Sequence, residues 1–126
     1  MISRSTRPKF LNLLLIKLPI TGVVSIAHRI SGVILILSLP LMVYALQLSL
    51  ASAESFALLF VTTETIWGKL LTLLVVWSLL HHLVAGLRFL LLDLDVGIEL
   101  ASARRNAWLV LVLSLTGTAF FAGAWL

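Results

Sequence analysis

Residues 70–87 read LLTLLVVWSLLHHLVAGL, an apolar stretch of 18 residues that contains no charged side chain. Two further charge-free stretches occupy residues 30–53 and 106–126. About 20 helical residues cross the hydrocarbon core of a bilayer. The continuous Leu, Val and Ile runs lack the period-2 alternation of a membrane β-barrel, the other structure that can span lipid. The sequence therefore predicts an all-α fold, a bundle of three transmembrane helices.

We expect one transmembrane anchor domain over residues 1–126. Its spans are predicted at about 22–50, 66–92 and 106–126, because the residues that flank the first two charge-free stretches are also mostly apolar. Prolines at positions 8 and 19 bound a stretch that is only weakly amphipathic. The N-terminal segment, residues 1–21, is therefore expected to lie at the membrane interface.

The composition agrees with lipid as the solvent. Hydrophobic residues make up 61% of the chain and charged residues 11%, with a mean hydropathy of +1.17, whereas soluble domains carry roughly a quarter of charged residues. The chain has no cysteine, which excludes disulfides and iron–sulfur clusters or zinc sites held by cysteine. The net charge of +4 comes from few basic residues concentrated toward the start of the chain, so we expect no nucleic-acid partner.

The positions of the basic residues predict the orientation. The first loop, residues 51–67, contains only acidic charges, whereas basic residues precede the first span and occupy the second loop. These basic residues are Arg4, Arg7, Lys9, Lys17, Arg104 and Arg105. The positive-inside rule then places the N-terminus in the cytoplasm and the C-terminus in the periplasm. Residues 1–8 lack the hydrophobic region of a signal peptide, so we expect a multi-pass protein of the bacterial inner membrane.

Polar residues gather at the start of the first span. At 100° per residue, Ser25, His28, Arg29 and Gly32 share one helix face. A guanidinium group suits a carboxylate or a polarised carbonyl as its partner. The alternative is an interfacial Arg29 that extends to the lipid headgroups, beside a serine that caps the helix.

A second polar cluster lies late in the second span, where Ser78, His82, Gly86, Phe89 and Asp93 share one face. A histidine one turn from a glycine suits a porphyrin. The imidazole can supply an axial ligand, and the missing side chain lets the macrocycle approach the helix. The alternative is a membrane histidine that is hydrogen-bonded to a neighbouring helix.

The histidines are predicted to lie at different depths in the membrane. His82 is expected about 15 Å from the cytoplasmic end of its helix and His28 about 9 Å from the same surface. His28 is then too shallow to bind the same iron, and His81 points roughly 100° away from His82. A haem with two histidine ligands would therefore need the second one from another chain.

Two motifs resemble a known family. Residues 19–32 contain Pro19-Ile-Thr21 and then Ser-Ile-x-His-Arg-x-Ser-Gly, which resembles the signature that opens the first helix of succinate dehydrogenase cytochrome b subunits. Residues 82–93, His-x-x-x-Gly-x-Arg-x-x-x-x-Asp, resemble the second signature of that family. Arg7-Pro8 followed by Asn12-Leu13 is similar to its N-terminal segment. The resemblance covers essentially the whole chain.

The resemblance implies roles for individual residues. His82 would be the axial ligand of haem b, with the second histidine supplied by a second membrane-anchor subunit. Ser25 and Arg29 would line the ubiquinone site. The haem pocket and its propionates would be contacted by His28, Arg29, Gly86 and Arg88. This sequence differs from the family pattern at Phe89, where many relatives carry a histidine. A propionate contact is therefore expected to be missing there.

The resemblance also implies partners. Succinate would be oxidised in a flavoprotein subunit, and an iron–sulfur subunit would pass the electrons to quinone, so this chain alone would not oxidise succinate. Three alternatives remain open: the anchor of a fumarate reductase, a structural anchor that has lost haem, and a small membrane transporter subunit. Against the transporter, the polar groups gather in one half of the membrane and leave the third span nearly unmarked.

Overall fold

The computed structural model describes residues 17–125, and these fold into four helices without a strand. The helices are α1 (Ile20–Ala51), α2 (Ala53–Glu64), α3 (Ile66–Asp93) and α4 (Leu100–Trp125). Three of them, α1, α3 and α4, are long and apolar enough to cross a membrane. The predicted all-α fold with three transmembrane helices is thus confirmed.

The helices differ from the expected spans in two places. α4 begins at Leu100, six residues before position 106, because the charge-free stretch marks the hydrocarbon depth and the helix continues beyond it. Residues 53–64, expected as part of a loop, form α2. The hydroxyl of Ser52 caps this helix by accepting from the backbone N–H of Ser55 at 3.1 Å, while the backbone N–H of Ser52 donates to the Ser55 hydroxyl at 3.0 Å.

The N-terminal segment predicted over residues 1–21 is described only in part. Lys17–Pro19 are not helical, and α1 begins at Ile20. Arg4, Arg7 and Lys9, together with the motif at residues 7–13, lie outside the described residues.

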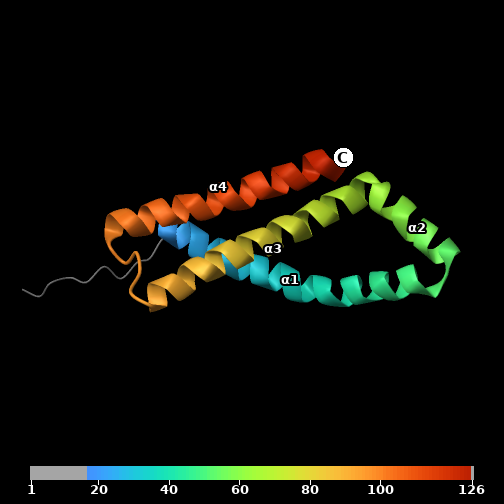
Figure 1. Cartoon of the computed structure of the whole chain (residues 1–126), viewed down its shortest axis with the longest axis horizontal. Helices are drawn as coiled ribbons and strands as arrows, with labels where there is room; N and C mark the ends of the chain where they lie inside the picture. Colours follow the sequence, from blue (N-terminus) through green and yellow to red (C-terminus); the bar gives the residue numbers. More distant parts are fainter. Residues whose placement is uncertain (1–16, 126) are drawn as a thin grey trace, which may run out of the picture.

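A sharp corner joins α2 to α3 at the end of the bundle away from the α3–α4 loop (Figure 1). Thr65 caps α3, since its hydroxyl accepts from the backbone N–H of Gly68 at 3.1 Å. A Cβ at Gly68 would overlap the carbonyl oxygen of Thr62 and lie 2.8 Å from the Cα of Thr63. The corner therefore requires glycine at this position.

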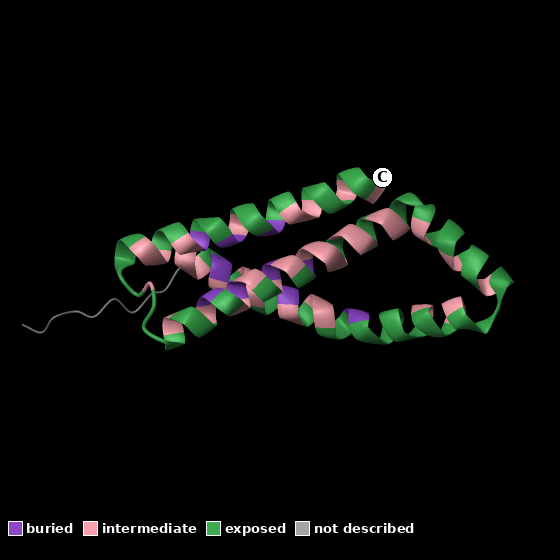
Figure 2. Ribbon diagram, in the orientation of Figure 1, coloured by how far each residue is buried: buried purple, intermediate pink, exposed green. Residues whose placement is uncertain are grey.

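The helix α3 packs against both α1 and α4. Figure 2 shows the buried residues gathered where the three long helices meet. The end of the bundle that includes α2 is mostly exposed. The buried apolar residues are Val24, Ala85, Ala107 and Val110, and the buried polar ones are Ser31, Ser38, Ser78, His81, Arg88 and Ser114. Small residues at helix contacts let the backbones approach closely, and the large aliphatic side chains point outward, as expected in lipid.

Candidate functional site

The imidazole rings of His28 on α1 and His82 on α3 lie face to face. Their centroids are 4.1 Å apart and their planes differ by 9°. Phe89 meets the ring of His28 nearly edge-on, with centroids 5.2 Å apart. The two polar clusters predicted from the sequence therefore come together at one crossing of α1 and α3.

A hydrogen bond selects the tautomer of the neutral His82 ring. Its Nδ1 lies 3.1 Å from the backbone carbonyl oxygen of His28. The hydroxyl of Ser31 donates to the same carbonyl at 2.8 Å and lies 3.4 Å from Nδ1. A carbonyl oxygen can only accept, so Nδ1 carries the proton and Nε2 keeps its lone pair. That lone pair is available to a metal ion.

Two glycines make room for the two rings. A Cβ at Gly32 would lie 3.0 Å from Cε1 of His82, and a Cβ at Gly86 would lie 3.6 Å from Nε2 of His28. Each helix thus provides a histidine and, one turn further along, the glycine that receives the histidine of the other helix. A porphyrin was predicted to approach the helix at Gly86. In the structure the ring of His28 lies there instead.

The predicted difference in depth between the two histidines is wrong, because their rings are stacked. Two causes explain the error. His28 lies eight residues after the start of α1 and His82 eleven residues before the end of α3, which reduces the difference to about 4.5 Å along the axes. The two helices also cross (Figure 1), so distance along an axis is a poor measure of depth.

His82 lines a groove between α1 and α3 that we call the His82 groove. Its volume is about 370 Å³. The other lining residues are Gly32, Leu35, Ile36, Ser38, Leu39, Met42, Val75 and Leu79. The hydroxyl of Ser38 is bonded back to the Leu35 carbonyl at 2.8 Å, so the groove offers an almost wholly apolar surface beside one imidazole. This is the usual character of a site that holds a flat organic cofactor.

The other predicted site residues lie around this crossing at different exposures. Ser25 is half-buried and Arg29 is exposed, one turn apart on α1. Asp93, at the end of α3, is exposed. In the part of the chain that the structure describes, no three His, Cys, Asp or Glu side chains gather to hold a metal ion.

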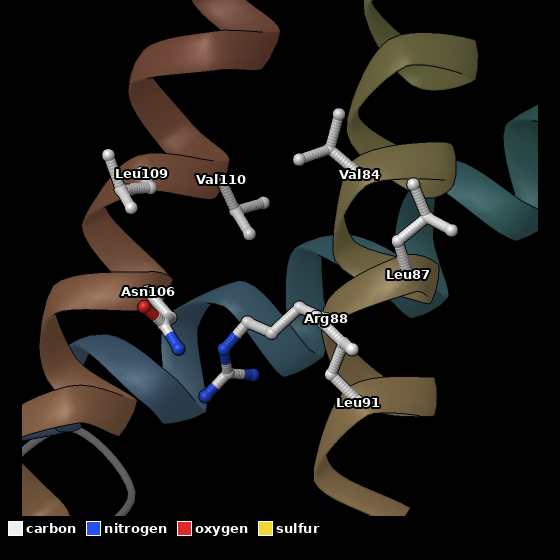
Figure 3. Close-up of a pocket in the computed structure, with 7 residues that line it drawn as sticks. All are labelled: Val84, Leu87, Arg88, Leu91, Asn106, Leu109 and Val110. Carbon is white, nitrogen blue, oxygen red and sulfur yellow. The ribbon is translucent and has the colours of Figure 1, made fainter. Parts of the chain in front are cut away.

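Arg88 lies away from the His82 groove. It is buried on the side of α3 that faces α4, where its Nη2 donates to the carbonyl oxygen of Ala103 at 3.4 Å. With Asn106 it lines a second groove, between α3 and α4 (Figure 3). The family resemblance implies that Arg88 and His82 contact one cofactor, whereas Arg88 lines the groove beside α4 and His82 the groove beside α1.

His81 faces away from its neighbour, as the 100° rotation per residue predicts. It is fully buried and its Nδ1 lies 3.3 Å from the hydroxyl of Ser114 on α4. Trp77 stacks on its ring with centroids 5.2 Å apart. The contacts of Ser31 and Asn106 were not predicted from the sequence. For Ser31 a signal existed, since a helical serine commonly bonds to a carbonyl three or four residues earlier.

Three apolar helices are packed through small residues, and two of them, α1 and α3, cross at a pair of histidines. Such a bundle defines a multi-pass membrane protein with a polar site between its helices. The family model described as succinate dehydrogenase/fumarate reductase transmembrane subunit matches residues 3–121. The chain therefore belongs to this family, as a cytochrome b type membrane anchor.

Two relatives of this chain share one name. The chain is 38% identical over 121 residues to the succinate dehydrogenase cytochrome b556 subunit of Coxiella burnetii, covering 95% of this chain and 96% of the relative. It is 30% identical over 106 residues to the protein of that name from Paracoccus denitrificans, covering 84% and 82%. The predicted family is thus confirmed, and the bacterial relatives support the inner membrane as the location.

Proposed function

We propose that this chain is the membrane anchor of a succinate:quinone oxidoreductase, that His82 is an axial ligand of haem b, and that Ser25 and Arg29 help to form the ubiquinone site. The observation that carries the haem assignment is the hydrogen bond from Nδ1 of His82 to the His28 carbonyl. Histidines that bind metals commonly donate their other ring N–H to a backbone carbonyl, which fixes the tautomer and the direction of the ring. Relatives named cytochrome b556 point to the same cofactor.

The residues present fit a haem. A single imidazole beside an apolar groove suits an iron that already has four ligands from a macrocycle. His82 would hold the iron, and the aliphatic residues of the His82 groove would contact the ring. Bound there, haem b would accept and release one electron at a time. The protein's own contribution is to select the tautomer that has its lone pair on Nε2 and to place the ring between Gly32 and His28.

The second axial ligand would come from another subunit. The rings of His28 and His82 lie face to face, so His28 is not placed to hold the same metal ion together with His82. His81 is bonded to Ser114 on the other side of α3. A second membrane-anchor subunit would supply the missing histidine, and a flavoprotein and an iron–sulfur subunit would complete the complex.

The quinone assignment rests on the positions of Ser25 and Arg29. They flank His28 on α1, and Arg29 is exposed, so its guanidinium can reach a ligand beside the helix. Hydrogen bonds from Arg29 and Ser25 to a quinone oxygen would stabilise the negative charge that develops there on reduction. The same arrangement would serve a fumarate reductase that runs the reaction in the opposite direction, and the named relatives favour succinate oxidation.

The two adjacent histidines provide a matched test. We would purify the intact complex containing His82→Gly or His81→Gly and record reduced-minus-oxidised spectra against the flavin content. His82→Gly should lose the b-type band and regain it when imidazole is added, because free imidazole can occupy the vacated position. His81→Gly should keep the band.

The outcomes separate ligation from a structural role. A complex that retains its full haem band in His82→Gly would contradict the proposal. Loss of the band in both variants without recovery in imidazole would also contradict it, since the histidines would then serve only to pack α3.

A further inference from the structure

Arg88 is a buried charge, and no carboxylate among residues 17–125 forms a recorded ion pair with it. Its side chain is 7% exposed, and its Nε has no hydrogen-bond partner among the described residues. The contact of Nη2 with the Ala103 carbonyl is long, at 3.4 Å, and the guanidinium carbon lies 5.3 Å from the centre of the Phe89 ring. The recorded ion pair within residues 17–125 joins Glu64 and Lys69, far along the chain. Burying an unpaired charge is costly, so an anion bound here would stabilise the structure.

The groove that contains Arg88, here called the Arg88 groove, offers hydrogen-bond donors at one point and an apolar surface elsewhere. Its volume is about 250 Å³, and its lining consists of Val84, Leu87, Arg88, Leu91, Asn106, Leu109 and Val110. Figure 3 shows the amide nitrogen of Asn106 turned toward the guanidinium group of Arg88. Two donors that converge without an acceptor between them form a site for an acceptor. No carboxylate is among the described residues that line the groove.

A glycine leaves room for the amide of Asn106. In the loop between α3 and α4, Gly97 has a φ of +78°, and a Cβ at this residue would lie 2.7 Å from Nδ2 of Asn106. Any side chain would therefore both strain the loop and displace the amide. The loop and α4 thus leave room for the Asn106 amide beside Arg88.

The position of Arg88 near one end of α3 suits contact with lipid phosphate groups. The 28 residues of α3 extend about 42 Å, while the hydrocarbon core of a bilayer is about 30 Å thick. A centred α3 would project about 6 Å beyond the core at each end. Arg88 lies five residues before the end of α3, or about 7.5 Å along the axis. An α3 that is centred and close to the membrane normal would thus hold the guanidinium near the boundary between acyl chains and headgroups.

We propose that the Arg88 groove binds an acidic phospholipid, with the phosphate between Arg88 and Asn106 and an acyl chain along the aliphatic residues. Leu87, Leu91 and Leu109 are 54%, 47% and 49% exposed, so the groove opens toward the bilayer rather than toward water. Basic pockets between transmembrane helices are suited to acidic headgroups. This inference does not rest on the assignment of His82.

The test measures lipid bound to the intact complex. Native mass spectrometry would follow the retention of phosphatidylglycerol by the detergent-purified complex during titration of that lipid, with phosphatidylcholine as the neutral comparison. Arg88→Gln should weaken the tightest phosphatidylglycerol site about tenfold or more, because a charge-assisted hydrogen bond is lost. Asn106→Leu should weaken it by a smaller factor. The matched control is Arg105→Gln, which removes an exposed charge from the same helix as Asn106 and should have less than a twofold effect.

Three results would overturn the proposal. Equal weakening by Arg105→Gln would show that only the surface charge matters. Displacement of the bound phosphatidylglycerol by inorganic phosphate at similar concentration would assign the site to a free anion. A cross-link from a photoreactive residue at position 91 to another subunit in place of lipid would assign the Arg88 groove to a protein partner.

Discussion

Gly32 of α1 and His82 of α3 are in such close contact that a Cβ at position 32 would lie 3.0 Å from Cε1 of the imidazole. The corresponding contact between Gly86 and His28 is looser, at 3.6 Å. Real Cβ atoms rarely approach another atom to 3.0 Å, whereas 3.6 Å is an ordinary van der Waals distance. The two glycines therefore differ in how much they constrain the site, although both lie at the same helix crossing.

This difference predicts unequal effects of two identical substitutions. Gly32→Ala should displace the His82 ring, weaken its bond to the His28 carbonyl and lower the haem-to-flavin ratio of the purified complex several-fold. Gly86→Ala should leave that ratio close to the wild-type value. Equal ratios in the two variants would mean that the ring of His82 is not the element that holds the haem.

Arg29 should affect quinone reduction without affecting succinate oxidation. Loss of its hydrogen bond to the quinone in Arg29→Leu is expected to slow electron transfer from succinate to ubiquinone about tenfold to a hundredfold. The rate with a soluble electron acceptor, which takes electrons before they reach the membrane, should stay unchanged. Arg105→Leu serves as the control for lost charge, and a similar quinone rate in both variants would remove Arg29 from the quinone site.

Gly68 should be required at the corner between α2 and α3. Gly68→Ala would force its Cβ against the backbone of residues 62 and 63, and we expect a loss of about 1–3 kcal/mol in stability, the usual cost of overpacking. Gly123→Ala is the matched control, because nothing lies within 4 Å of a Cβ there. That variant should be neutral or slightly stabilised, since alanine favours a helix. Thermal unfolding of the purified complex would measure both.

His81 should be replaceable at little cost. Its Nε2 is buried and has no hydrogen-bond partner among residues 17–125, and the Ser114 hydroxyl keeps its own bond to the Leu111 carbonyl at 3.1 Å. His81→Leu removes a polar atom that lacks a partner, so stability should change by less than about 1 kcal/mol or increase. A loss of several degrees in the melting temperature would indicate that Nε2 has an unseen partner, such as a buried water.

The orientation of the chain is a separate prediction. Arg4, Arg7, Lys9 and Lys17 precede the first span and Arg104 and Arg105 follow the second, so the N-terminus should be cytoplasmic and the C-terminus periplasmic. Alkaline phosphatase fused after residue 126 should be active, because it folds only in the periplasm. Green fluorescence from a protein fused at the same place would contradict this orientation.

The sequence predicts the three long helices because hydropathy and length alone decide whether a segment suits lipid. The helix α2 was not predicted because its 12 residues carry no strong periodicity. The serine cap at Ser52 is too common a pattern to predict a helix by itself. The direction of His81 follows from helix geometry within one segment. The stacking of His28 on His82 could not be predicted, because it depends on the register and crossing of two helices, which a pattern within either helix does not contain.

The stacked pair has one more consequence. The carbonyl group of His28 accepts the hydrogen bond from Nδ1 of His82. This carbonyl belongs to the same peptide unit as the backbone nitrogen of Arg29. In the proposed assignment, the iron ligand and the quinone-binding cation are therefore joined through a single rigid plane of six atoms. A tilt of that plane when quinone binds would be transmitted to the imidazole, so occupancy of the quinone site should be detectable as a change in the haem spectrum.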